Sequence, residues 1–194
     1  MGIAGTASRT ITAEELMEMP DDEVERDIIR GELREYPTED TMTRRNPFHS
    51  TVETTISALL WNWLKTQPAP RGSILCGEAG FRLRRDPDTY VGIDVAYVSA
   101  AMAAGLDRNM RFYDGPPILA VEILSPSDKH VKIVEKVELY LEVGTTVWVV
   151  DPDFRTIRVH RPGRAVEFFN DQQDIPGDPE LPGFRVAVAQ FFQS

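Results

Sequence analysis

Hydrophobic residues recur along the chain with two different spacings, which together predict a mixture of helices and strands. From Phe48 to Lys65 they fall every three or four positions, which is the period of an amphipathic helix. Residues 118–124 instead form a nearly continuous hydrophobic run, as expected of a strand that is buried on both faces. Residues 146–150 form a second such run, and residues 156–160 are expected to pair with it across a turn.

The other predicted elements are shorter and are placed by their turn and capping residues. Thr12 and Glu15 form the capping-box pattern that starts a helix, and Pro20 ends it. Gly31 separates two extended segments, which predicts a β-hairpin. We further expect strands at 73–76, 80–83 and 93–98, a connection at 100–115, a helix from Asp128 to about Val143, and a tail at 186–192 that packs back on the body. The predicted fold class is α/β, in the α+β arrangement of a central mixed β-sheet flanked by helices.

The length of 194 residues fits one α/β domain with a hydrophobic core. We expect residues 1–11 to be a flexible N-terminus and residues 12–194 to form a single domain. No hydrophobic run approaches the roughly 20 residues of a membrane-spanning helix, and the start of the chain lacks the pattern of a secretory signal. Cys76 is the single cysteine, which excludes an internal disulfide and a cysteine-based zinc site. The simplest interpretation is a reducing, cytoplasmic location and no membrane partner.

The charge of the chain argues against non-specific binding to nucleic acid. There are 31 acidic and 21 basic side chains, so the formal net charge is −10. Phosphate contacts require Lys and Arg, and a negative field slows the approach of a polyanion. The basic residues do cluster, which allows a local basic surface on an acidic body. The clusters are Arg44-Arg45, Arg82-Arg84-Arg85 and Lys129-Lys132-Lys136.

Two acidic residues lie inside or beside hydrophobic strand segments. Glu122 interrupts the run at 118–124, where a buried carboxylate is costly unless it is paired or coordinates a metal. Asp94 lies beside the hydrophobic residues of the segment at 93–98. Acids on neighbouring strands are able to share Mg²⁺ or Mn²⁺, which prefer oxygen ligands. The alternative is structural: an ion pair or helix N-terminus would satisfy Glu122, and Asp94 would cap a turn.

A lysine on the helix after Glu122 is the third candidate for catalysis. Lys132, Lys136 and Tyr140 are spaced four apart and therefore share one face of that helix. Near a metal, Lys136 is able to orient the attacking water and to offset negative charge in a phosphoryl transition state. Its alternative role is that of a surface lysine paired with Glu135 or Glu138.

Several sequence blocks recur together in one known family. They are Gly31-Glu32-Leu33, His49 on the long helix, residues 93–98, residues 120–128, residues 135–144, Val147 to Pro152, and residues 181–185. In their order and number these blocks resemble the Uma-two family, a large bacterial group of restriction-endonuclease-like proteins. The resemblance covers about residues 12 to 192. It implies the fold of the PD-(D/E)xK nuclease superfamily.

The resemblance also implies a set of site residues. Asp94 and Glu122 would hold Mg²⁺ with help from the backbone carbonyl of Ile123, and Lys136 would serve as the catalytic lysine. In the superfamily pattern the lysine stands two residues after the second acid, where this chain has Leu124. The family has Pro before the first acid where this chain has Ile93, and Pro ligates nothing.

Four accessory candidates also follow from the resemblance, and the residues themselves give three of them a plainer interpretation. They are Glu53, His49, Glu32 and Ser125. His49 and Glu53 stand four apart on the predicted helix, which is also the spacing of an exposed pair. Ser125 opens a Ser-Pro-Ser-Asp segment that is typical of a helix cap. Gly31, Gly92 and Gly144 are expected in turns or at helix ends.

The leading functional hypothesis is a metal-dependent nuclease that hydrolyses phosphodiester bonds of DNA, with RNA as a less favoured substrate. Its cofactor would be Mg²⁺ or Mn²⁺, and nucleic acid would be its partner. One alternative is a non-catalytic binding or regulatory protein that keeps the fold as a homodimer, which the acidic charge favours. Another is a metal-dependent hydrolase of a small phosphorylated substrate, which would need no basic cleft for DNA.

Overall fold

The computed structural model describes residues 10–20, 22, 24–36, 47–125 and 130–193. The helices are α1 (Ala13–Met17), α2 (Pro47–Thr66), α3 (Ala100–Ala104), α4 (His130–Glu142) and the 3-10 helix η1 (Val188–Phe192). The strands are β1 (Glu25–Ile29), β2 (Glu32–Tyr36), β3 (Ser73–Arg84), β4 (Thr89–Val98), β5 (Tyr113–Asp114), β6 (Leu119–Ile123), β7 (Thr146–Asp151), β8 (Thr156–His160), β9 (Glu167–Asn170), β10 (Asp174–Pro176) and β11 (Arg185–Ala187). The predicted division at residue 12 stays a prediction, because residues 1–9 lie outside the described part.

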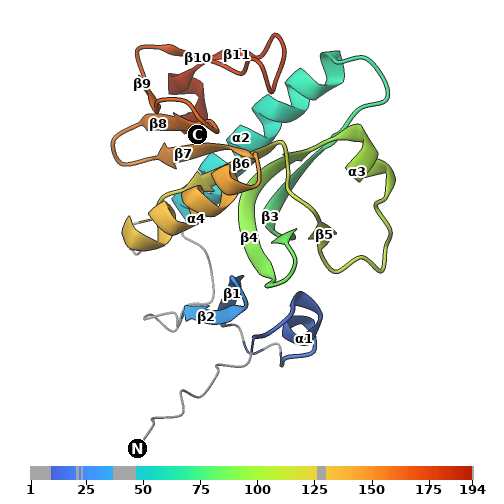
Figure 1. Ribbon diagram of the computed structural model, residues 1–194. Helices are drawn as coiled ribbons and strands as arrows, with labels where there is room; N and C mark the ends of the chain where they lie inside the picture. Colours follow the sequence, from blue (N-terminus) through green and yellow to red (C-terminus); the bar gives the residue numbers. More distant parts are fainter. Residues whose placement is uncertain (1–9, 21, 23, 37–46, 126–129, 194) are drawn as a thin grey trace, which may run out of the picture.

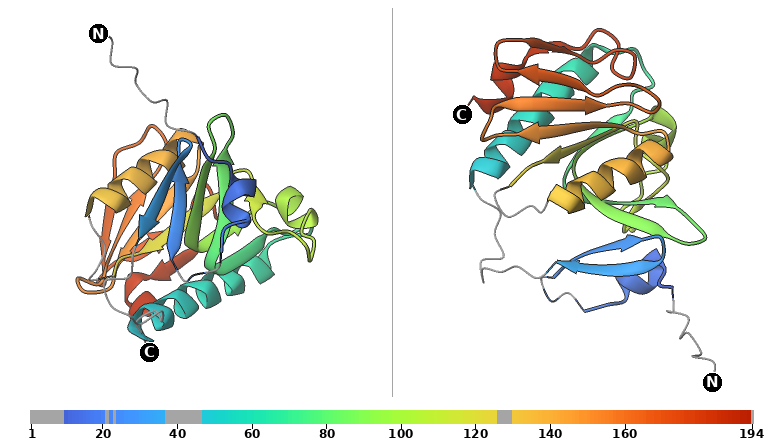
Figure 2. Two further views of the ribbon diagram at one scale, coloured as in Figure 1. Left: turned by 90° about the horizontal axis from the view of Figure 1, so that it is seen from below. Right: turned by 60° about the vertical axis from the view of Figure 1, so that its left-hand side comes forward.

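Most described strands join one mixed sheet, which confirms the predicted fold class. Its order is β2-β1-β4-β6-β7-β8-β9, with β3 also paired to β4 and β5 to β3. The pairs β6–β7 and β3–β5 are parallel, and the other pairs in this sheet are antiparallel. Helices α2 and α4 cover opposite faces of the sheet (Figures 1 and 2). The central strands β4, β6 and β7 are therefore enclosed between two helices.

The hydrophobic core is divided by the sheet into two clusters. One cluster packs α2 residues such as Ile56 and Leu60 against β6, β7 and the C-terminal segment. The other packs α4 residues such as Val137 and Tyr140 against β3, β4 and the opposite side of β6 and β7. All five residues of β6 are buried, as the continuous hydrophobic run predicts. Glu122 is the one charged residue among them.

Strand β3 differs from the prediction of two short strands. It is one strand with a β-bulge, where the pairing with β4 shifts between Cys76 and Ala79. Gly77 and Glu78 lie in the bulge and have φ angles of 81° and 59°. A left-handed backbone at a non-glycine residue such as Glu78 is unfavourable and requires support from its surroundings. The gap between the two predicted strands is therefore a bulge within one continuous strand.

Strand β4 begins earlier than predicted, and Gly92 lies in its interior rather than in a turn. Its pairing partner on β3 is Gly80. A Cβ atom at position 92 would lie 2.4 Å from Glu78 Oε2, so a larger residue there would require the end of the Glu78 side chain to move. Gly31 and Gly144, in contrast, have φ angles of 83° and 88° at a turn and a helix end, as predicted.

The C-terminal tail packs on α2, as predicted. Val188, Phe191 and Phe192 of η1 are buried in the same cluster as the hydrophobic side of α2. The Trp63 indole N–H donates a hydrogen bond of 3.0 Å to the carbonyl of Pro182. The tail also contains β10 and β11, which pair with each other and were not predicted because each has only three residues. Trp61, the other tryptophan on α2, is 53% exposed.

Replacing Trp63 with Phe is expected to lower the free energy of unfolding by about 1 kcal/mol. The ring would still fill most of the space, but the carbonyl of Pro182 would lose its partly buried donor. Urea denaturation of the two proteins measures the difference. Trp61→Phe is the matched control, because its exposed ring should contribute much less. Equal effects of the two substitutions would contradict this account of how the tail is held.

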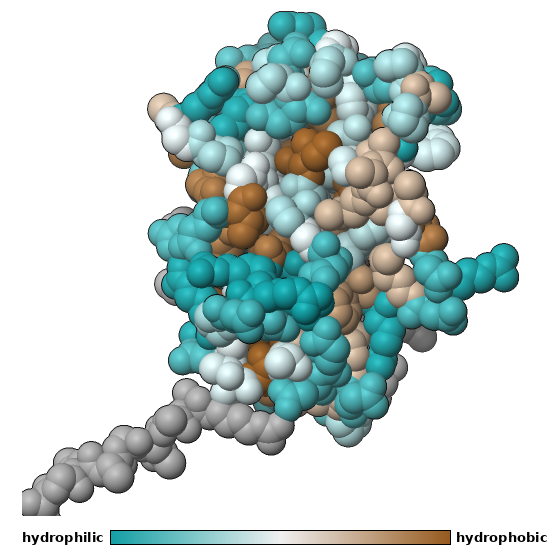
Figure 3. Space-filling model, turned by 45° about the vertical axis from the view of Figure 1, so that its right-hand side comes forward, coloured by the Kyte–Doolittle hydropathy of each residue, from teal (hydrophilic) through white to brown (hydrophobic). Residues whose placement is uncertain are grey.

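The molecular surface is mostly hydrophilic in the view of Figure 3, with hydrophobic residues in separate patches. Among the described residues, no helix combines the length and the apolar character that crossing a membrane requires.

Candidate active site

Glu122 and Lys136 form a buried ion pair between β6 and α4. The Lys136 ammonium donates hydrogen bonds of 2.8 Å to Glu122 Oε2 and 2.9 Å to the carbonyl of Gly92. The Tyr140 hydroxyl donates to Glu122 Oε1 at 2.6 Å, so both carboxylate oxygens have a donor. Lys136 is 5% exposed, which overturns the alternative of a surface lysine paired with Glu135 or Glu138. Tyr140 lies one turn after Lys136, and this spacing accounts for its contact with the same acid.

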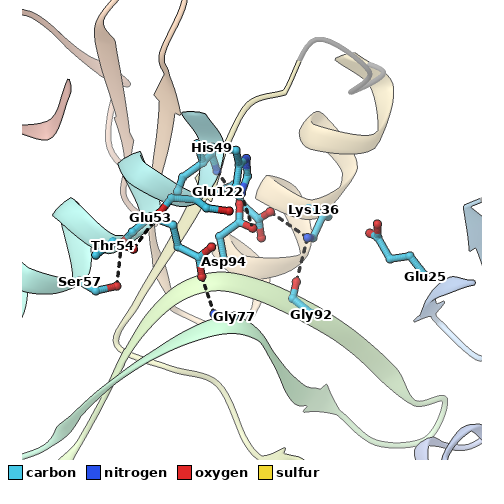
Figure 4. A network of polar contacts seen from close by, with 12 residues as sticks. Glu25, His49, Glu53, Thr54, Ser57, Gly77, Gly92, Asp94, Glu122 and Lys136 are labelled. Carbon is cyan, nitrogen blue, oxygen red and sulfur yellow. Dashed lines mark hydrogen bonds and ion pairs between the residues drawn. The ribbon is translucent and has the colours of Figure 1, made fainter. Parts of the chain in front are cut away.

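Asp94 lies on the neighbouring strand β4, beside the end of β6. Its Oδ2 accepts a hydrogen bond of 2.8 Å from the backbone N–H of Ile123. Its Oδ1 lies 3.3 Å from His49 Nε2, with the roles of donor and acceptor set by the tautomer of the ring. Asp94 and Glu122 are each 4% exposed. The structure thus brings the two predicted acids together on adjacent strands, and Figure 4 shows them with Lys136.

His49 and Glu53 join this group from the first half of α2 (Figure 4). The sequence favoured an exposed pair at this spacing, but His49 is 7% and Glu53 9% exposed. Glu53 Oε1 accepts a hydrogen bond of 2.5 Å from the N–H of Gly77 in the β3 bulge. The interpretation as an exposed pair is therefore wrong, because the face of α2 that carries both residues packs onto the sheet. We call Asp94, Glu122, Lys136, His49 and Glu53 the candidate site.

The remaining accessory candidates have different surroundings. Glu32 lies exposed on β2, where it pairs with Arg34, and no contact of the candidate site includes it. Ser125 stands two residues after the end of β6 and is partly buried. The rest of the helix cap predicted at Ser125–Asp128, residues 126–128, lies outside the described residues. The role of both residues stays a prediction.

The charges of the candidate site are strongly coupled. Burial raises the pKa of Glu122 to about 7, with the Lys136 charge opposing the shift and the Asp94 charge adding to it. Burial alone would lower the pKa of Lys136, but the neighbouring groups Glu122, Tyr140 and Asp27 together more than offset this and hold that pKa well above its usual value. Lys136 therefore remains a cation at neutral pH. Glu122, in contrast, changes its protonation near neutrality.

The free energy of unfolding of the metal-free protein is expected to fall as the pH rises from about 4.5 to about 7. A carboxyl group with a raised pKa binds more protons in the folded than in the unfolded state. Its contribution to stability is thus fully present below the unfolded value of 4.5 and is lost as the pH rises through about 7. The loss is on the order of 3 kcal/mol. Urea denaturation in EDTA across this range measures it, and Glu122→Gln should make the slope clearly shallower, while the raised pKa of Asp27 leaves a further slope of the same sign. An identical slope in the variant would contradict the assignment to Glu122.

The basic clusters do not form the free basic surface that the sequence allowed. Arg82 is buried and pairs with Asp114 and Glu14. The neighbouring arginines and the lysines of α4 also have acidic partners. These pairs are Arg84–Glu142, Arg85–Asp114, Lys132–Glu25 and Lys136–Glu122. Arg44, Arg45 and Lys129 lie outside the described residues. The described members of the basic clusters thus form ion pairs with acidic residues of the same chain.

The donor atoms of the candidate site fit a magnesium ion better than zinc. Within the described ranges, no three His, Cys, Asp or Glu side chains are arranged to hold a metal. Two buried carboxylates from adjacent strands remain, and Mg²⁺ is usually bound by one or two carboxylates together with waters and substrate phosphates. The mutual repulsion of Asp94 and Glu122 is the feature that a cation would relieve. The role of the Ile123 carbonyl as a further ligand stays a prediction.

Comparisons with known proteins identify a family and a solved structure with a similar fold. A model of the Uma2 family, described as "Putative restriction endonuclease", matches residues 13–189. The chain belongs to the Uma2 (Uma-two) family. A solved structure of a putative nuclease belonging to DUF820, from Anabaena variabilis ATCC 29413, superposes with a TM-score of 0.74. The two sequences are 20% identical, and the match covers 94% of this chain and 97% of the other. A search of curated proteins gives no match.

The predicted family is thereby confirmed. The description of the family and the fold of the chain both support a nuclease. The structure also adds residues that the sequence did not single out. Tyr140 was noted only for sharing a helix face with Lys136, and Gly77 fell in the gap between two predicted strands. Asp27, a buried acid on β1, was not considered at all.

Proposed function

We propose that this Uma2 protein is a nuclease that uses Mg²⁺ or Mn²⁺ to hydrolyse phosphodiester bonds of DNA. The observation that carries the proposal is the buried arrangement of two acids and a lysine on β4, β6 and α4. Buried charges lower the stability of a core unless they are paired with opposite charges or bind a ligand such as a metal ion. The family and the fold both support a nuclease. The single cysteine favours a cytoplasmic site of action.

Each member of the candidate site has a role in this proposal. Asp94 and Glu122 would hold the metal ion, with the Ile123 carbonyl as an additional oxygen donor. A bound divalent cation would polarise the scissile phosphate and make a bound water more acidic. Two N–H groups of Lys136 are used by Glu122 and Gly92, and its charge is positioned to offset that of a phosphate. His49 orients Asp94, and Glu53 fixes the β3 bulge beside it.

The direct test is cleavage of supercoiled plasmid, single-stranded DNA and RNA oligonucleotides by the purified chain. We expect cleavage of DNA with Mg²⁺ or Mn²⁺ and none in EDTA. Glu122→Gln should be inactive, whereas Glu138→Gln should cleave like the wild type, because Glu138 is an exposed acid on α4. If the protein cleaves RNA faster than DNA, then RNA replaces DNA as the proposed substrate. Absence of cleavage of every nucleic acid would overturn it.

A second candidate function follows from the pairing of the basic clusters. Because the described Arg and Lys residues of the basic clusters have acidic partners, a long polyanion would find few free cations in those clusters. A small phosphorylated substrate would not need them. Hydrolysis of a chromogenic phosphodiester such as bis(p-nitrophenyl) phosphate, without cleavage of DNA, would favour this second function.

A further inference from the structure

Asp27 is a buried carboxylate on β1 that the proposed mechanism does not use. It is 1% exposed, although the strand belongs to the outer hairpin of the sheet. Its Oδ1 accepts a hydrogen bond of 3.3 Å from the N–H of Gly92. Its Oδ2 is buried without a hydrogen bond of good geometry in the described part of the chain, and the Tyr36 hydroxyl of β2 is the nearby polar group that faces this carboxylate. Buried polar atoms usually have a partner, so an orphaned carboxylate oxygen calls for an explanation.

Asp27 and Lys136 bind the same residue from different elements. Asp27 accepts from the N–H of Gly92, and Lys136 donates to the carbonyl of Gly92 at 2.9 Å. Gly92 stands two residues before Asp94 on β4, where a Cβ atom would lie 2.4 Å from the carboxylate of Glu78. The hairpin strand β1 is thereby joined to the lysine of the candidate site through a single residue of β4.

The hydrogen bond to Gly92 does not by itself require a charged residue. An asparagine would accept from the same N–H and would avoid burying a charge. Burial raises the pKa of Asp27, and the positive charges of Lys136 and Lys132 oppose that shift. A carboxylate at this position therefore costs stability, and its nearest compensation comes from the cations of α4. This cost is explained if the negative charge acts on Lys136.

We propose that Asp27 is a positioning residue of the candidate site, which holds the Lys136 ammonium in place through its charge and through Gly92. The inference rests on the proposed function. Glu122 is at once the partner of Lys136 and a candidate metal ligand, so its negative charge is shared between two cations. Asp27 supplies a second negative neighbour that takes no part in metal binding. The Lys136 ammonium then keeps its position when Glu122 binds the metal ion.

The experiment compares Asp27→Asn and Asp27→Glu with wild type. Asparagine keeps an acceptor for Gly92 but removes the charge, and glutamate restores the charge. Glu25→Gln is the matched control, because it removes an acid two residues away on the same strand that pairs with Lys132. The measurements are the melting temperature, Mn²⁺ affinity by calorimetry, kcat and KM for DNA cleavage, and the ¹⁵N NMR signal of the Lys136 ammonium.

For Asp27→Asn we expect a melting temperature at least equal to that of the wild type and an unchanged Mn²⁺ affinity. The value of kcat should fall about tenfold or more with little change in KM, because the charge of Lys136 would be misplaced. The ammonium signal should shift or broaden. Asp27→Glu should recover part of kcat, and Glu25→Gln should behave like the wild type.

Two results would overturn the inference. One is an unchanged kcat together with an unchanged ammonium signal in Asp27→Asn. The other is a lower melting temperature with a parallel loss of Mn²⁺ binding, which would show that Asp27 only supports the fold. If the wild type cleaves no DNA, the proposed function fails, and the ammonium signal then decides on Asp27 alone: a changed signal supports the contact and an unchanged signal refutes it.

Discussion

Replacing Asp94 with Asn is expected to abolish metal-dependent cleavage while leaving the protein at least as stable as the wild type. The amide keeps an acceptor for the N–H of Ile123, which Asp94 binds at 2.8 Å. It also removes the charge that disfavours the ionised form of its neighbour Glu122. Affinity for Mn²⁺ should fall by at least about a hundredfold, more than the loss of an outer-shell partner costs.

Calorimetric titration with Mn²⁺ and thermal denaturation in EDTA measure these two effects of Asp94→Asn. Loss of Mn²⁺ affinity without loss of stability identifies a metal ligand, because replacing a residue needed only for folding would lower the melting temperature. A variant that unfolds more easily yet still binds Mn²⁺ would show that Asp94 is structural. Asp114→Asn is a control. It also removes an acid from an ion pair, with Arg82, but neither residue of that pair belongs to the candidate site. It should leave Mn²⁺ binding intact.

Replacing Lys136 with Met is expected to separate cleavage from metal binding. The side chain is buried and is the cationic partner of Glu122, so its loss leaves an uncompensated acid in the core. Breaking a buried ion pair in this way typically costs about 3–5 kcal/mol. The Lys136 charge lowers the pKa of Glu122, and without it that pKa would rise further. The loss of stability should thus grow as the pH rises above neutrality.

Cleavage by Lys136→Met should be lost, whereas Mn²⁺ should bind at pH 8 at least as tightly as it does to the wild type. The variant retains both acids and lacks the cation that competes for Glu122. Lys132→Met is the control, because Lys132 lies one turn earlier on α4 and pairs with the exposed Glu25. A surface pair of this kind contributes about 1 kcal/mol or less. Cleavage by Lys136→Met at the wild-type rate would exclude the lysine from the mechanism.

The sequence predicted the elements whose hydrophobic pattern is long or continuous. Helix α2 and strands β6 and β7 lie where the pattern placed them, because burial on one or both faces determines that pattern directly. Glu122 was predicted as a site residue for the same reason, since a charge within such a run has to be satisfied. The grouping of Asp94, Glu122 and Lys136 came from the family resemblance, because spacing along the chain does not show which strands are adjacent.

Features that depend on pairing between distant segments could not be predicted. The β3 bulge looks like a break in the sequence, and only its register against β4 shows that the strand continues. Glu53 and His49 have the spacing of a surface pair, but their face of α2 packs onto the sheet. Asp27 stands in an irregular alternation next to Arg26, so its burial depends on how the hairpin meets β4. The arginine clusters likewise reveal their acidic partners only in the fold.

The central claim is that Asp94 and Glu122 form a metal site, and calorimetric titration of Mn²⁺ into the wild type and Glu122→Gln tests it most directly. We predict binding of Mn²⁺ by the wild type and by the control Glu138→Gln, and its loss in Glu122→Gln. The same samples would then be assayed for plasmid cleavage. Absence of binding by the wild type at millimolar Mn²⁺, or equal binding by all three proteins, would contradict the claim and leave the two acids with a structural role.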